Sequence, residues 1–325
     1  MVGDRYLNFL IMRTLLIYLL LLPLAVTSQY GGFLKATRLK RNTGEYCGAW
    51  IQVPVDTTTD KTPCAVTFFY HGDGEKVRTA LITDSTNSQG MRKLLVAGTG
   101  PTAVLATRMH PKYLNPGRTD YTRTIWIAPV LDSIKYANWQ TWIDSAAWCY
   151  VRDSLGPIAD TNRIACMGLS QGAFGTNIFI SDSTLNKWRG HRLHSAAVSC
   201  SPGGWPNQIT GTGYKWCARN WPPFFGFVAA NDLTAGVSNS TGPYNSLNTT
   251  AATTGFKGPL NALNFIEFDG TEPATSGHVI WPVVFNFDPT AIDHPLINGY
   301  TYRFIMPMQQ WVLQFTNPPG LPLGY

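Results

Sequence analysis

The sequence predicts an α/β protein, a class in which a mostly parallel central sheet carries helices on both faces. Short apolar segments rich in β-branched residues alternate with helical patterns from about residue 47 to the carboxyl end, as expected for this class. The chain has 325 residues, of which 44% are hydrophobic. It shows no internal repeat, and this amount of apolar surface is sufficient for one large core. We therefore expect a single folded domain.

Seven segments are predicted to be strands, because each is a short apolar run bounded by turn-forming residues. They are residues 49–53, 65–70, 124–129, 163–167, 195–200, 224–229 and 264–268. Helical patterns are found at residues 90–96, 139–154, 173–181 and 302–315. Residues 234–259 are rich in Ser, Thr, Gly and Asn and indicate a surface excursion. Within it, Asn239 and Asn248 begin N-x-[ST] acceptor sequences for N-glycosylation.

The first 28 residues have the pattern of a secretory signal peptide. Arg13 supplies a basic start, residues 14–26 are apolar, and Thr27 and Ser28 are small residues at the end of the run. Met12 is an alternative start of the same signal. A transmembrane anchor is the competing interpretation, but the run is shorter than the about 20 residues of a span, and Pro23 interrupts it. We therefore expect a secreted, extracellular protein with no stable membrane anchor after signal cleavage.

Residues 29–41 are a possible basic propeptide in front of a domain that spans residues 42–325. The sequence Arg38-Leu39-Lys40-Arg41 resembles the cleavage site of furin-type convertases, and a solvated basic run is the alternative. Residues 1–41 contribute five of the six net positive charges of the chain. The remaining domain is nearly neutral, so its charge gives no reason to expect nucleic acid or anionic lipid as a partner.

Six cysteines behind a signal sequence indicate disulfides, because the secretory lumen is oxidising. One of several possible connectivities pairs them sequentially. The candidate pairs are Cys47 with Cys64, Cys149 with Cys166, and Cys200 with Cys217, each 17 residues apart. The last pair is favoured because it closes a loop rich in Gly and Pro. A bridge or two buried thiols are both plausible for the middle pair.

The pentapeptide Gly168-Leu169-Ser170-Gln171-Gly172 fits the pattern G-x-S-x-G and lies between a predicted strand and a predicted helix. This is the setting of a nucleophile on a sharp strand-to-helix turn. Glycines are needed there because strand and helix approach closely. We therefore predict that Ser170 is a catalytic nucleophile. A chance match in a chain that contains many Gly and Ser residues is the alternative.

A serine is a weak nucleophile until a positioned histidine accepts its proton, and in this setting the acid and then the histidine follow the serine along the chain. Asp232 follows the predicted strand 224–229, and His278 follows the strand 264–268. We predict His278 as the base and Asp232 as the acid that orients it. Asp269 is the rival acid, although it shares the loop of the histidine. His294 is the rival base, although no predicted strand precedes it.

An acyl-transfer site also needs hydrogen-bond donors for the developing oxyanion. The backbone amide of Gln171 is one candidate, by its position after the serine. Gly72 and Asp73 are the other candidates, in the turn His71-Gly72-Asp73-Gly74 after strand 65–70, because glycine lets the backbone turn its amides inward. A plain strand-to-loop reversal is the alternative. We interpret His71 as a structural residue under this turn rather than a base.

With these residues, the chain resembles the α/β-hydrolase superfamily, and within it the secreted esterases related to polyhydroxybutyrate depolymerases and feruloyl esterases. The resemblance covers roughly residues 47–316 and rests on the His-Gly turn, on Asn162-Arg163-Ile164 leading into the elbow, and on Gly277-His278-Val279-Ile280-Trp281. It implies an α/β-hydrolase fold and a serine carboxylesterase that works through an acyl-enzyme without cofactor or metal. The turn lacks a run of glycines and Asn231-Asp232 lacks the longer pattern around the acid, so substrate details do not carry over.

The expected partner is an ester substrate: a small molecule, a polysaccharide-linked ester or a polyester. Trp205 and Trp281 are candidates to bind it by stacking, because each lies on a loop near the predicted site, although most tryptophans belong to the core. Two alternatives remain. One is a serine peptidase of the prolyl oligopeptidase type, whose usual amino-terminal propeller this sequence does not contain. The other is a binding module on a catalytically inactive hydrolase fold.

Overall fold

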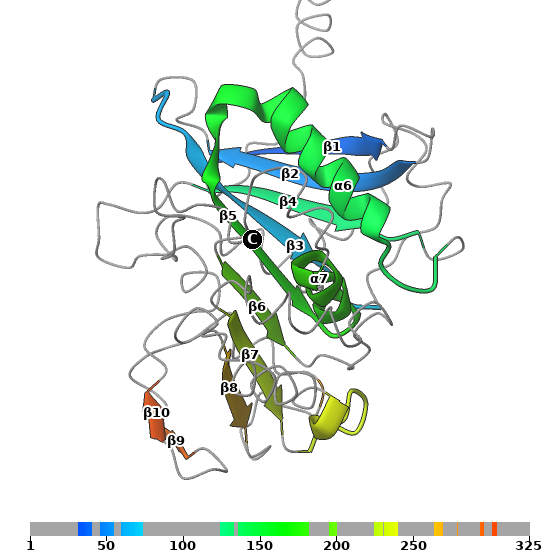
Figure 1. Cartoon of the computed structure of the whole chain (residues 1–325), viewed down its shortest axis with the longest axis vertical. Helices are drawn as coiled ribbons and strands as arrows, with labels where there is room; N and C mark the ends of the chain where they lie inside the picture. Colours follow the sequence, from blue (N-terminus) through cyan, green and yellow to red (C-terminus); the bar gives the residue numbers. More distant parts are fainter. Residues whose placement is uncertain are drawn as a thin grey trace, which may run out of the picture.

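An eight-stranded sheet forms the centre of the computed structural model, with the strands in the order β1-β2-β4-β3-β5-β6-β7-β8 (Figure 1). The structure describes residues 32–40, 46–54, 60–73, 124–132, 136–181, 195–199, 224–229, 231–239, 263–268, 278, 293–295 and 301–303. The strands of the large sheet are β1 (Gly32–Lys40), β2 (Tyr46–Pro54), β3 (Cys64–Tyr70), β4 (Thr124–Val130), β5 (Ala159–Leu169), β6 (Ser195–Ser199), β7 (Phe224–Ala229) and β8 (Leu263–Phe268).

The sheet is antiparallel at one end and parallel over the rest. β1 pairs with β2 and β2 pairs with β4 in antiparallel fashion, whereas the strands from β4 through β3 to β8 run parallel. Every residue of β3 and β4 is buried, as expected for parallel strands covered on both faces. Because parallel strands end at the same edge, the carboxyl ends of β3, β5, β7 and β8 all lie along that edge.

Two helices lie over one face of the sheet (Figure 1). α6 (Thr141–Tyr150) packs on β1, β2 and β4, and α7 (Gln171–Ser181) packs on β3, β5 and β6. α6 continues into a π-helical turn, Val151–Leu155, and a 3-10 turn, Gly156–Ile158, before β5 begins. Gly156 has a φ of 49°, a conformation that glycine adopts without steric cost, and it lets the chain reverse into β5.

The described core between these helices and the sheet is mostly apolar, and it includes a buried polar pair, Tyr70 and Asp144. Phe68 of β3 and Phe179 of α7 meet edge to face, with their ring centroids 5.3 Å apart. The Tyr70 hydroxyl donates a hydrogen bond of 2.6 Å to Asp144 Oδ1 on α6, and both residues are buried. Burial, with Asp144 nearby, raises the pKa of Tyr70 well above its ordinary value. The same causes raise the pKa of the Cys47 and Cys166 thiols.

The structure corrects the predicted Cys47–Cys64 bridge, and for Cys149 and Cys166 it has the two thiols that were the alternative to a bridge. Cys47, Cys64, Cys149 and Cys166 all carry thiols, so neither of the first two sequential pairs forms. Cys47 lies on β2 and Cys64 on β3, and β4 separates these two strands. The distance between β2 and β3 is therefore about twice the 4.8 Å spacing of neighbouring strands, which is too far for a disulfide. Cys149 lies at the end of α6, which packs on β1, β2 and β4, whereas Cys166 is buried in β5. Cys200 and Cys217 lie outside the described residues.

All seven predicted strands are present, with ends that differ by a few residues. The helix predicted at 139–154 is shorter and ends in the π-helical turn, and the helix at 173–181 begins two residues earlier. The start of the predicted helix 302–315 is wrong, because Tyr302 and Arg303 belong to β10 (Thr301–Arg303). This strand pairs with β9 (Asp293–Pro295) in a small antiparallel sheet. The predicted helix 90–96 lies outside the described residues.

The amino-terminal strand was not predicted. β1 belongs to the segment interpreted as a possible propeptide, and it pairs with β2 from Gly32 to Lys40, with Leu39 fully buried. Cleavage after Arg41 stays a prediction, as does the signal peptide, whose residues 1–28 lie outside the described part of the chain. No helix within the described residues is sufficiently long and apolar to cross a membrane.

Candidate active site

Ser170 occupies a strained turn between β5 and α7. Its φ is 52°, and it is the only residue other than glycine with a positive φ among the described residues. A Cβ at Gly172 would lie 1.9 Å from the carbonyl oxygen of Tyr70, and one at Gly168 would lie 2.2 Å from the oxygen of Gly172. Neither position can hold a larger residue without moving the backbone. Strand, turn and helix therefore meet as the G-x-S-x-G pattern predicts, with the serine held in a conformation typical of functional sites.

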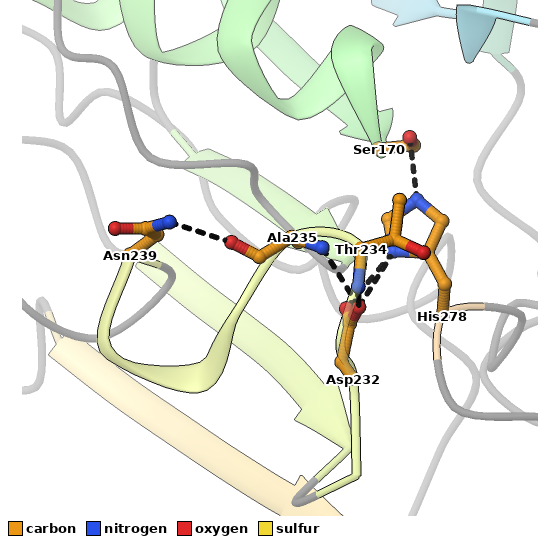
Figure 2. Close-up of polar contacts among 6 residues, drawn as sticks. All are labelled: Ser170, Asp232, Thr234, Ala235, Asn239 and His278. Atoms are coloured by element: carbon orange, nitrogen blue, oxygen red, sulfur yellow. Dashed lines mark hydrogen bonds and ion pairs between the residues drawn. The ribbon is translucent and has the colours of Figure 1, made fainter.

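The structure brings the three predicted catalytic side chains into one hydrogen-bonded chain (Figure 2). His278 Nε2 lies 2.6 Å from Ser170 Oγ. His278 Nδ1 lies 2.9 Å from Asp232 Oδ2 and 3.1 Å from Asp232 Oδ1. Because a carboxylate only accepts hydrogen bonds, the imidazole proton is on Nδ1 and the Nε2 lone pair faces the serine hydroxyl. This is the arrangement needed to remove the serine proton during attack.

Asp232 is fixed by the turn that follows β7. The carboxylate is buried, with the residue 2% exposed, and its Oδ1 accepts hydrogen bonds from the backbone N–H groups of Thr234 and Ala235 at 2.9 and 2.8 Å. Asn239 Nδ2 in turn donates to the Ala235 carbonyl at 2.9 Å (Figure 2). These donors compensate the loss of water around a buried charge. The acid is therefore positioned independently of the histidine.

The turn after β3 lies against the nucleophile. A Cβ at Gly72 would be 3.5 Å from Ser170 Cβ and 2.9 Å from Leu169 Cδ1, so glycine is required for this approach. His71 is 3% exposed, and its Nε2 accepts a hydrogen bond of 3.0 Å from the Leu131 N–H. As expected, His71 is a structural residue of this turn and is separate from the Ser170 hydrogen-bond chain. Asp73 is exposed beside it.

Sequence reasoning missed the residues that support the acid. The N–H groups of Thr234 and Ala235 and the amide of Asn239 were not predicted to hold Asp232. A signal was present, because Asp followed two residues later by Thr, with Gly close behind, is typical of an Asx turn. Asn239, a candidate for glycosylation, is exposed and uses its side-chain nitrogen in this network.

Several other predicted residues cannot be placed. Trp205, Trp281, Asn248 and the rival acid Asp269 lie outside the described residues. The rival base His294 lies on β9, but its side chain is not among those described. Within the described part of the chain, no three His, Cys, Asp or Glu side chains are grouped in a way that could hold a metal ion.

Comparison with a solved structure, together with the sheet order described above, shows that the chain has the α/β-hydrolase fold. It is similar to a thermostable esterase with a TM-score of 0.51 and 21% identity, over 77% of this chain and 59% of that one, so it matches little more than half of the esterase's length. No family model matches the sequence, and no curated protein does.

Two further solved structures, a fungal esterase and an archaeal peptidase, are also similar to this chain. One of two esterases of the fungus Rhizomucor miehei matches with a TM-score of 0.46 and 12% identity, over 76% of each chain. The acylaminoacyl peptidase of Pyrococcus horikoshii matches with a TM-score of 0.43 and 14% identity, over 75% of this chain and 38% of the peptidase.

Proposed function

We propose that the protein is a secreted serine hydrolase that cleaves carboxylic esters through an acyl-enzyme on Ser170. The observation that carries this proposal is the continuous hydrogen-bonded chain from Ser170 Oγ through His278 to Asp232. A histidine with a purely structural role would not be expected to contact a strained serine. An aspartate without a function would not be expected to be buried and held by two backbone N–H donors. Together these features fit a nucleophile, a base and an orienting acid.

The reaction follows from the positions of these atoms. Ser170 Oγ attacks the ester carbonyl while His278 Nε2 accepts its proton, and Asp232 stabilises the imidazolium that forms. The imidazolium then protonates the departing alcohol, which leaves an ester between Ser170 and the acyl group. Water, deprotonated by the same histidine, then attacks the acyl carbon, and the imidazolium returns the proton to Ser170 Oγ as the acid leaves. The backbone amides of Gln171 and of Gly72 or Asp73 are the donors for the oxyanion in both steps.

The substrate class is proposed from sequence features alone. The Gly277-His278-Val279-Ile280-Trp281 sequence and the elbow support an enzyme of the polyhydroxybutyrate depolymerase or feruloyl esterase type. The signal-like residues 1–28 support secretion. Trp205 and Trp281 are the residues we propose to contact the acyl or alcohol group of the substrate.

Turnover by the purified protein tests this proposal. We expect hydrolysis of p-nitrophenyl acetate and butyrate, and a loss of about 10⁴-fold or more in kcat for Ser170→Ala, because the nucleophile is essential. Peptide anilides assayed in parallel separate an esterase from a peptidase. Full activity of Ser170→Ala would show that the proposal is wrong. A wild-type protein that cleaves only the anilides would assign it to the peptidases.

A further inference from the structure

The segment between β4 and α6 contacts both of the turns that carry the predicted oxyanion donors. We name its described residues, 131, 132 and 136–140, the bridging segment. We propose that this segment aligns the two donors with each other, through hydrogen bonds to His71 and to the side chain of Gln171. The inference rests on the proposed function and adds a positioning role for side chains that lie outside the serine, histidine and aspartate chain.

The first contact fixes the peptide that contains the Asp73 amide. Leu131 N–H donates to His71 Nε2, so the ring proton is on Nδ1, which donates to the Gly72 carbonyl at 2.7 Å. The peptide between Gly72 and Asp73 is planar, and the described chain contains no cis peptide bond. The Asp73 N–H therefore points opposite to the Gly72 oxygen. His71 holds the Gly72 oxygen toward the interior, and the Asp73 N–H therefore points away from the interior.

The second contact holds the residue that follows the nucleophile. Gln171 Nε2 donates to the Ala137 carbonyl and, at 2.7 Å, to Asn138 Oδ1. Both partners are acceptors, which fixes the orientation of the Gln171 amide with its nitrogen toward the segment. The backbone N–H of Gln171 is the other predicted donor. An anchored side chain limits the rotation of that backbone at a turn where Ser170 is already strained.

The bridging segment is itself well held. Trp139 is 3% exposed, and its ring lies edge to face with Tyr70 at 4.9 Å and with His71 at 4.9 Å. A Cβ at Gly175 of α7 would lie 2.7 Å from this ring, so Trp139 packs directly on that helix. Within the segment, Gln140 Nε2 donates a hydrogen bond of 2.9 Å to the Asn138 carbonyl. One packed element therefore touches β3, its turn and α7.

Substitution of the side-chain contacts separates this role from general stability. Gln171→Met removes both hydrogen bonds while it keeps the backbone donor, and Asn138→Ala removes one acceptor from an exposed position. We expect kcat to fall about tenfold for Gln171→Met with little change in KM, because misplaced catalytic groups slow the chemical step. Asn162→Ala is the matched control, since it removes an exposed amide from the opposite end of β5.

A thionoester substrate gives a readout that a purely structural role would not change. Sulfur is a poor hydrogen-bond acceptor, so an oxyanion donor contributes little when the carbonyl oxygen is replaced. We expect the defect of Gln171→Met and Asn138→Ala to be several-fold smaller on the thionoester than on the oxygen ester. We also expect the double variant to be no worse than Gln171→Met alone. Equal losses on both esters, or wild-type kcat in both variants, would overturn the proposal. Failure of the proposed function would appear instead as activity that survives Ser170→Ala.

Discussion

The glycines around Ser170 are required by contact distances and not by a left-handed backbone, because neither Gly168 nor Gly172 has a positive φ. The carbonyl oxygen of Tyr70 occupies the space where a side chain at Gly172 would begin. The same carbonyl ends the strand that leads to the predicted oxyanion turn. The strained serine and the turn at Gly72 are therefore parts of one close contact between β3 and the start of α7.

Gly172→Ala should therefore be among the most damaging single substitutions in the chain. A Cβ only 1.9 Å from an oxygen forces the backbone apart, and we expect a loss of about 3 kcal/mol in stability, together with activity. Thermal unfolding of the purified variant measures this effect. Gly156→Ala is the control for backbone strain alone, because a Cβ there meets nothing within 4 Å and only the backbone conformation, φ 49° and ψ −123°, costs about 1–3 kcal/mol. An unchanged Tm for Gly172→Ala would contradict the close contact.

The candidate site could largely be predicted residue by residue, and its supports could not. The structure brings Ser170, Asp232 and His278 together, and their juxtaposition could be predicted because each follows a strand in an order that the G-x-S-x-G pattern demands. Leu131 acts through a backbone N–H whose partner, His71, is 60 residues away and is brought near only by the tertiary fold. Asn239 bonds to Ala235 within one turn, where the sequence indicates an Asx turn but not this side-chain contact. Sequence assigns a residue type to such positions but no partner.

The turn after β7 acts as a unit that positions the carboxylate of Asp232. Asn239 holds the Ala235 carbonyl, and the Ala235 N–H holds Asp232. We expect Asn239→Ala to lose about 1 kcal/mol of stability, the typical value of one hydrogen bond. If the same 1 kcal/mol is lost from the transition state because Asp232 is no longer held in position, kcat falls about fivefold. Ser238→Ala, an exposed change on the same turn, should leave both unchanged. Wild-type kcat in Asn239→Ala would show that Asp232 does not depend on this bond.

β1 shows where sequence patterns failed for a whole element. Basic residues at 35, 38 and 40 favoured a leader or a solvated run, and the pairing of this strand with β2 depends on residues that follow it in the chain. The cysteine spacing failed for a related reason, since equal separation along the chain does not determine which strands become neighbours. The parallel strands were predicted well because burial on both faces leaves a continuous apolar run.

A chain that begins at residue 42 should accordingly be less stable than one that begins at residue 29. Removal of β1 exposes the edge of β2 and loses the buried Leu39, which alone contributes about 2 kcal/mol. Urea denaturation of the two proteins measures the difference. Equal midpoints would show that β1 contributes nothing to the folded domain and would favour its interpretation as a removable propeptide.

For the whole molecule, the buried thiols and Tyr70 make stability depend on alkaline pH. Cys47, Cys166 and Tyr70 keep their protons in the folded state because burial and Asp144 raise each pKa. In the unfolded chain they ionise near their ordinary values of 9.0 for cysteine and 10.0 for tyrosine. The folded state thus binds more protons above pH 9.0. Their contribution is complete below that pH and is lost as the pH rises through and beyond it.

Denaturation midpoints between pH 7 and 10.5 test this expectation. Each buried thiol should contribute a decrease of about 1 kcal/mol per pH unit above pH 9. A Cys47→Ala/Cys166→Ala variant should show a shallower decline than the wild type. A decline of the same slope in the variant would show that other groups cause it. Thiol reagents at pH 8 should modify these two cysteines only after unfolding, since only the thiolate reacts.

Covalent labelling shows directly whether Ser170 is a nucleophile that His278 activates. A fluorophosphonate probe added to the purified full chain should form one adduct, which mass spectrometry locates on the peptide that contains Ser170. Labelling should be absent in Ser170→Ala and slowed about 10²–10⁴-fold in His278→Ala, because the base that removes the serine proton is missing. An adduct at another residue, no adduct at all, or labelling of His278→Ala at the wild-type rate would contradict the account.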